Sequence, residues 1–173
     1  QGESGSLLIP LGFSADGRTA YLQKDEDKGP DGVYAFDVAS HAMRLQLRDP
    51  VADPDHALFG PQREVVGVEF DDARPRAVFF DENGAAAKLQ HGLEAALPGQ
   101  VVSIEQYAAD GNLALVSVRS DHSPGDYYLF DLAKKNLNHL LSHREWIDPD
   151  RMGEQHPVTV TSRDGLTRDG FLT

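Results

Sequence analysis

The sequence FSADGRTAYL at residues 13–22 recurs twice in related form along the chain. FGPQREVVGV at 59–68 and YAADGNLALV at 107–116 align with it, at steps of 46 and 48 residues. Each copy begins with an aromatic residue, continues through a polar turn and ends in an apolar run. This pattern predicts a hairpin that joins two β-strands.

The strand that follows each hairpin repeats as well. VYAFD at 33–37, AVFFD at 77–81 and YYLFD at 127–131 all end in Phe-Asp. One offset of 94 residues relates the first unit to the third throughout, and it maps Asp16-Gly17 onto Asp110-Gly111 and Asp37 onto Asp131. We interpret the Phe-Asp pairs as architectural positions of the repeat rather than as functional sites.

A repeat of about 47 residues that holds four short strands is typical of a β-propeller blade. We therefore predict a mainly β fold, a partial β-propeller of about three four-stranded blades near residues 7–50, 55–99 and 100–143. Strands of the first blade are expected near 7–13, 18–23, 32–38 and 43–48, and those of the third near 101–108, 112–119, 126–132 and 137–142.

The second unit departs from this pattern after Asp81. Its apolar residues recur at helical spacing up to the Pro98-Gly99 stop, although Gly92 disfavours a helix. These apolar residues are Ala86, Leu89, Leu93, Ala96 and Leu97. We predict one short amphipathic helix at about 84–97, which replaces or covers the outer strand of this blade.

The bulk composition excludes several classes of partner. A net charge of −12 argues against nucleic acid and against an anionic membrane, because both require a basic surface. The chain has no cysteine, so it can form neither a disulfide nor a thiolate metal site. No apolar run approaches the roughly 20 residues that span a bilayer. We expect a soluble protein, and its localisation, cytoplasmic or periplasmic, is left open.

The character of the sequence changes after the third unit. We expect residues 1–147 to form the partial propeller and the polar segment 148–156 to be a linker. PVTVTSRDGLTRDGFLT at 157–173 then predicts a new β-hairpin.

This ordered set of features resembles a known family. PVTVTSRDGLTRDGFLT at 157–173, after a propeller and a linker, resembles the entry into the α/β-hydrolase domain of the prolyl oligopeptidase family of serine peptidases. VRSDHSPGDYYLFDLAKKNLNHLL at 118–141 and the helix that ends in ALPG resemble the end of the propeller in that family. Within that family they are most similar to the acylaminoacyl-peptidase and dipeptidyl-peptidase-like branch. There a propeller of about seven or eight blades caps an α/β-hydrolase domain and restricts its access to peptides.

The resemblance implies that this chain carries the last three blades and the first hairpin of the hydrolase domain. The partners it implies are the peptide substrate of the full-length protein, and that protein's own hydrolase domain and remaining blades. The parent would be a hydrolase that uses a Ser-His-Asp triad. Because the triad would lie beyond Thr173, we expect no activity from this chain alone.

The sequence contains no recognisable catalytic motif, so we predict no catalytic residue. The nearest match to the G-x-S-x-G nucleophile motif, Gly2–Ser6, lacks the final glycine. The seven histidines lack the spacing of a metal motif, so we predict no metal and no cofactor. Residues 25–32 are faintly similar to a calcium loop, but Phe36 stands where the bidentate glutamate is required, and we interpret them as a solvated hairpin tip.

One loop is the candidate site. Arg119, Asp121 and His122 belong to RSDHSPGDYY at 119–128, between two predicted strands. The resemblance implies that such loops line the cavity between propeller and hydrolase, where these side chains could touch substrate or the other domain. The alternative is that Asp121 and Ser123 only satisfy backbone groups of the turn.

A second function class stays open, a non-catalytic propeller that binds proteins or peptides. A pure propeller would use its last strand to close the ring, whereas residues 157–173 start something new. Since three blades cannot close a ring, we also expect exposed faces and strand edges to make the isolated chain self-associate or be only marginally stable.

Overall fold

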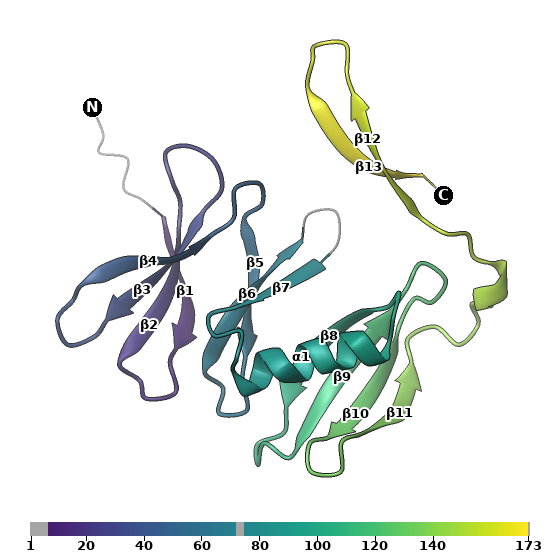
Figure 1. Ribbon diagram of the computed structural model, residues 1–173, viewed down its shortest axis with the longest axis horizontal. Coiled ribbons are helices and arrows are strands. Elements are labelled where there is room, and N and C mark those ends of the chain that lie inside the picture. Colours follow the sequence, from purple (N-terminus) through teal and green to yellow (C-terminus); the bar gives the residue numbers. More distant parts are fainter. Residues whose placement is uncertain (1–6, 72–74, 173) are drawn as a thin grey trace. The chain divides into compact units, whose positions relative to one another are not determined.

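A computed structural model describes residues 7–71 and 75–172 of the chain. These residues divide into two compact units, one up to Leu89 and one from Gln90 onward. The segment similar to a nucleophile motif, Gly2–Ser6, lies outside the described residues. The fold is mainly β, as predicted, and is built of antiparallel sheets with one α-helix in the described part (Figure 1).

Blade one is a four-stranded sheet whose strands follow one another in chain order. Its strands are β1 (Leu8–Phe13), β2 (Thr19–Lys24), β3 (Gly32–Asp37) and β4 (Met43–Arg48). The predicted tight turn between β1 and β2 is confirmed. Gly17 adopts a positive φ of 67°, and Asp16 accepts hydrogen bonds from the Ser14 hydroxyl at 2.7 Å and the Arg18 amide at 3.0 Å.

Blade two has three strands in its described part, followed by the predicted helix (Figure 1). Its elements are β5 (Pro54–Phe59), β6 (Val65–Asp71), β7 (Pro75–Phe79) and α1 (Ala85–Ala96). Gln90 of α1 is buried and donates a hydrogen bond of 2.7 Å to the carbonyl of Val102. Among the described residues no helix is long and apolar enough to cross a membrane.

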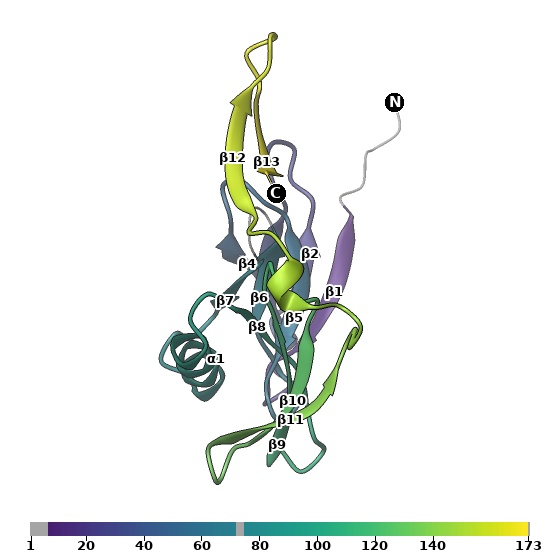
Figure 2. The ribbon, with the colours of Figure 1, turned by 90° about the vertical axis from the view of Figure 1, so that its right-hand side faces the viewer.

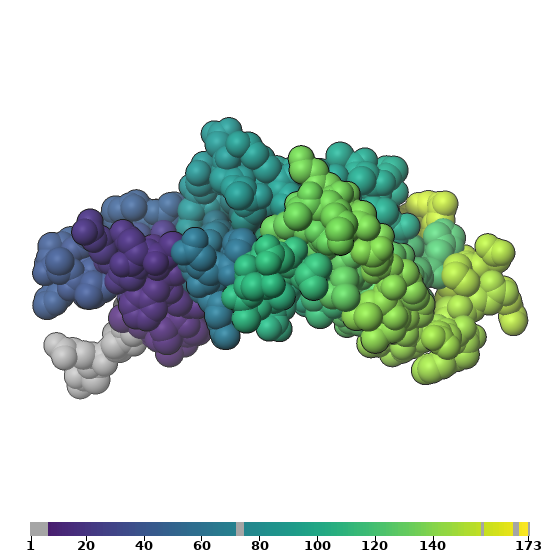
Figure 3. Space-filling view, turned by 90° about the horizontal axis from the view of Figure 1, so that it is seen from below, coloured from purple at the N-terminus to yellow at the C-terminus, as the bar shows by residue number. Residues whose placement is uncertain are grey.

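Blade three again has four strands in chain order, and its side chains form a continuous surface in Figure 3, in green. Its strands are β8 (Val101–Tyr107), β9 (Leu113–Arg119), β10 (Asp126–Asp131) and β11 (Asn136–Ser142). A short 3₁₀ turn at Pro149–Arg151 follows. The chain then forms the predicted hairpin from β12 (His156–Thr161) and β13 (Thr167–Leu172), which is a separate two-stranded sheet (Figure 2).

The offset of 94 residues extends to the irregularities of the sheets. The pairing of β1 with β2 shifts register between Pro10 and Gly12, and the pairing of β8 with β9 shifts between Ile104 and Gln106, 94 positions later. The same offset relates the shifts at Val33/Tyr34 and Tyr127/Tyr128 in the outer pairs of strands. It also relates the two turn residues with positive φ, His41 and Lys135. Blades one and three are therefore copies of one design.

The buried core of the first unit joins blades one and two. Val33 of β3 is buried in one cluster with Val68 and Phe70 of β6. Strand β1 lies against β5 and β6, and it passes so close that a Cβ atom added to Gly12 would stand 2.7 Å from a methyl group of Val65. The first strands of successive blades thus lie side by side, as propeller packing requires.

Candidate functional site

The candidate loop leaves β9 after Arg119 and enters β10 at Asp126. Its bend is held by the serines and the glycine. The amide of Ser120 donates to the carbonyl of Ser123 at 3.1 Å, the amide of Ser123 donates back at 3.2 Å, and Gly125 adopts a positive φ of 124°. The Ser123 hydroxyl accepts from the Gly125 amide, as the alternative interpretation expected.

Asp121 and His122 make contacts outside this turn. The carboxylate of Asp121 accepts a hydrogen bond of 3.1 Å from the amide of Gln155, and Nδ1 of His122 lies 3.0 Å from the carbonyl of Met152. Because a carbonyl can only accept, His122 donates from Nδ1. Both partners belong to the predicted linker, directly before β12. The loop of blade three is therefore tied to the segment that leads into the final hairpin.

The linker itself has local order. Asp148 caps the 3₁₀ turn, because its side chain accepts a hydrogen bond of 3.1 Å from the Asp150 amide. The Arg151 amide donates to the Asp148 carbonyl at 3.1 Å. Two contacts from the loop and this capped turn together define the path of the chain between blade three and the hairpin.

Blade three also holds a serine, a histidine and an aspartate, but in the wrong arrangement for a triad. Nε2 of His139 lies 3.2 Å from the Ser142 hydroxyl and 3.5 Å from the Asp126 carboxylate. A catalytic triad needs the two partners on opposite ring nitrogens, so that the base can take the serine proton while the acid holds the other nitrogen. Here both partners share one nitrogen, and the group has no nucleophile activation.

The loop similar to a calcium site is bound by an arginine. Nε of Arg48 donates to the carbonyl of Pro30 at 2.9 Å, and its guanidinium also contacts the carbonyl of Lys28. Glu26 accepts from the Tyr34 hydroxyl, a hydrogen bond that lowers the pKa of Glu26 and raises that of Tyr34. The contact of Glu26 with Tyr34 joins the two arms of the β2–β3 hairpin, and Arg48 of β4 binds its tip. We interpreted the segment as such a hairpin tip.

The Phe-Asp residues hold turns, as their repetition suggested. Asp37 accepts from the Ser40 amide at 2.7 Å and from the Ala39 amide at 3.1 Å. Asp131 accepts from the amides of the equivalent turn, and these backbone hydrogen bonds lower the pKa of both aspartates. Their role is architectural.

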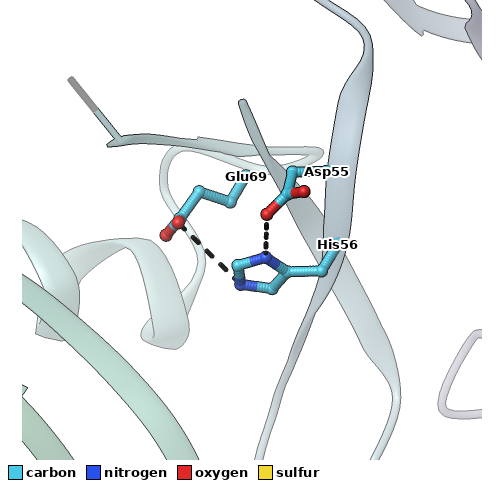
Figure 4. A group of neighbouring side chains, drawn as sticks. All are labelled: Asp55, His56 and Glu69. Atoms are coloured by element: carbon cyan, nitrogen blue, oxygen red, sulfur yellow. Dashed lines mark hydrogen bonds and ion pairs between the residues drawn. The ribbon is translucent and has the colours of Figure 1, made fainter. Parts of the chain in front are cut away.

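Blade two gathers a group that sequence reasoning missed (Figure 4). Asp55 and His56 on β5 and Glu69 on β6 each offer one ligand atom, and these atoms all lie within 4.8 Å of one another. Nδ1 of His56 lies 3.0 Å from the Asp55 carboxylate, and Nε2 lies 4.0 Å from that of Glu69. The adjacent Asp-His pair was visible in the sequence, but its partner became visible only through the pairing of β5 with β6.

The sequence is similar to a curated protein. The chain is 31% identical over 165 residues to dipeptidyl aminopeptidase BIII of Pseudoxanthomonas mexicana, and the match covers 95% of the chain. The chain is related to the prolyl oligopeptidase family. It spans 24% of the length of this dipeptidyl aminopeptidase. No family model matches the sequence.

Solved structures give partial similarities to this chain. The chain is similar to TolB from Acinetobacter baumannii with a TM-score of 0.49 and 18% identity, over 99% of the chain and 44% of TolB. It is similar to a prolyl endopeptidase with a TM-score of 0.48 and 14% identity, over 96% of the chain and 30% of that structure. The family relationship rests on the sequence match rather than on these similarities.

Proposed function

We propose that this chain is a propeller segment of a serine peptidase that limits peptide access to a hydrolase domain and docks on that domain. The observation that supports the proposal is the match to dipeptidyl aminopeptidase BIII over nearly the whole chain. In this proposal the segment has a supporting role, and the Ser-His-Asp triad belongs to the hydrolase domain.

We also propose the domain organisation that the sequence suggested. Residues 1–147 are the partial propeller, 148–156 the linker and 157–173 the first hairpin of the hydrolase domain. The hairpin exposes large apolar side chains at Val160, Leu166 and Phe171. Apolar groups in such number on a two-stranded sheet favour a covering partner, and in this proposal the partner is the rest of the hydrolase domain.

We propose that the loop restrains the linker between blade three and the hydrolase domain. Asp121 and His122 bind backbone groups of the linker, so they restrain the segment through which the hairpin is attached. Arg119, at the end of β9, is proposed to meet the substrate peptide or the hydrolase surface. A restrained linker would set the width of the passage between the two domains.

The test uses both the isolated chain and the full-length gene product. The full-length protein should hydrolyse dipeptidyl chromogenic substrates and be inactivated by a serine-directed fluorophosphonate, whereas the isolated chain should do neither. In the full-length protein Asp121→Ala should change the ratio of long-peptide to dipeptidyl-substrate turnover several-fold. The control, Asp110→Ala, lies in the β8–β9 turn at the opposite end of the same sheet and should leave the ratio unchanged.

Two results would contradict the proposal. One is serine-dependent turnover by the isolated chain, since its catalytic residues would then lie within these 173 residues. The other is a gene without a G-x-S-x-G sequence after Thr173, which would favour the non-catalytic binding propeller. An unchanged substrate ratio in Asp121→Ala would reject the role of the loop alone.

A further inference from the structure

We infer that Asp55, His56 and Glu69 form a site for one Zn²⁺ ion on blade two. His56 and Glu69 would ligate the ion, and Asp55 would orient the imidazole. This metal site is independent of the proposed peptidase role, because its three residues belong to β5 and β6 and lie outside the candidate loop at 119–128.

A β-bulge creates the site. The pairing of β5 with β6 places Pro54 opposite Phe70 and His56 opposite Glu69, so Asp55 is an extra residue without a partner of its own. In a regular strand Asp55 and His56 would point to opposite faces of the sheet. The bulge breaks this alternation and lets both side chains approach Glu69, as Figure 4 shows. Bulges are frequent where a strand re-aims a side chain at a functional site.

The distances fit an ion between the imidazole and the buried carboxylate. Nε2 of His56 and Oε1 of Glu69 are 4.0 Å apart, which is too long for a hydrogen bond. Two zinc bonds of about 2.1 Å reach about 4.2 Å when opposed and about 3.4 Å when tetrahedral. A small rotation of the half-exposed His56 ring therefore brings both atoms to zinc distance.

Asp55 supplies the support that zinc-binding histidines usually have. It accepts from Nδ1 of His56 at 3.0 Å, which leaves the lone pair on Nε2, the nitrogen that faces Glu69. The Glu69 side chain is only 10% exposed and thus held in place, whereas Asp55 and His56 are open to solvent, so water can complete the coordination. One imidazole with carboxylate suits Zn²⁺ better than Ca²⁺ or Mg²⁺, which prefer oxygen ligands alone.

The experiment is a calorimetric titration of the 173-residue chain with ZnCl₂ in a non-coordinating buffer. We expect one saturable site per chain, and His56→Gln should weaken it at least tenfold. Glu69→Gln should do the same, and Asp55→Asn should weaken it roughly tenfold, the usual effect of losing a supporting hydrogen bond to a ligand. Two-dimensional NMR of the imidazole protons should show the His56 ring as the one that shifts first upon zinc addition.

The matched control is His91→Gln. Nδ1 of His91 also lies near a carboxylate, 3.2 Å from Glu94 on the helix, but among the described residues this pair does not belong to a group of three possible metal ligands. Its affinity should match that of the unmodified chain within twofold. Absence of saturable binding, or equal binding by His56→Gln, would overturn the inference. Because Glu69 is nearly buried, circular dichroism and thermal unfolding without metal establish whether each variant folds. If Glu69→Gln does not fold, the exposed variant His56→Gln tests the site by itself.

Discussion

Blade two and blade three begin from the same repeat and diverge in what they build from it. In blade three the extra residue of the first strand lies 94 positions after that of blade one, and the four strands of the sheet lie in chain order. In blade two an extra residue is Asp55, near the start of β5, and a helix follows the third strand. In blades one and three the repeated aspartates accept hydrogen bonds that stabilise turns. In blade two an aspartate, a histidine and a glutamate lie close together.

The position of a bulge thus decides which side chains share a face of the sheet. In blade three the extra residue is Glu105, whose carboxylate receives a hydrogen bond from the Ser117 hydroxyl, an ordinary cross-strand contact. In blade two the extra residue is acidic as well, but its neighbour is a histidine opposite a buried glutamate. The same kind of defect gives a structural contact in one blade and a candidate metal site in the other.

Among the substitutions that distinguish the blades, we expect the largest loss of folding stability at Phe70 of blade two. Phe70→Ala should lower the free energy of unfolding by about 3–5 kcal/mol, because the side chain is fully buried and a cavity would remain. Urea denaturation measures the loss. Hydrogen exchange should show lost protection in β3 as well as β6, since Val33 of β3 belongs to the same cluster.

The control for this prediction is Phe13→Ala at the end of β1, where the ring is half-exposed. Its cost should stay below about 1 kcal/mol. Similar costs for the two variants would mean that Phe70 does not hold the first unit together.

A smaller change in stability is expected from replacing a glycine by alanine, and its sign should differ between the helix of blade two and a turn of blade one. Gly92 lies inside α1, and a Cβ atom added there would meet nothing within 4 Å. Gly92→Ala should raise the free energy of unfolding by about 0.5–1 kcal/mol, because alanine loses less conformational freedom in a helix.

The matched variant is Gly17→Ala in the β1–β2 turn. It has the same open space around the Cβ position but a φ of +67°, so it should be destabilising by about 1–2 kcal/mol. Thermal unfolding compares the two variants. If Gly17→Ala were stabilising, the free space around the Cβ atom, rather than the backbone conformation, would determine the effect of alanine at these two positions.

The smallest effect concerns the turn aspartates that blades one and three share. The pKa of Asp37 and of Asp131 is held below the ordinary value of 3.8, chiefly by backbone hydrogen bonds to the carboxylate. A carboxyl with a lower pKa in the folded state adds stability above its unfolded pKa, and this is lost as the pH falls through the folded value. The free energy of unfolding should therefore decline below about pH 4.

Replacement of both aspartates by asparagine should flatten this part of the acid decline. Urea denaturation at pH values from about 2 to about 5, a range that includes the ordinary aspartate pKa of 3.8, measures this decline in stability. An identical pH profile in the double variant would show that these hydrogen bonds are equally formed in the unfolded chain.

The repeat and most of the elements built on it could be predicted from the order of residues alone. The strands of blades one and three, the helix at Ala85–Ala96, the turn glycine Gly17 and the final hairpin lie within a few residues of their predicted positions. These features are local, because alternation of apolar residues, turn residues and helical spacing act over a few neighbours. The family resemblance followed from the same ordered features.

Which distant side chains meet could be seen only in the folded chain. Asp121 reaches Gln155 across 34 residues because the linker folds back on the loop of blade three. Glu69 faces His56 because the bulge at Asp55 sets the register of β5 against β6. A one-residue change of register would send one of these side chains to the other face of the sheet. Spacing along a chain does not specify register across a bulged pair of strands, so the grouping had to come from the fold.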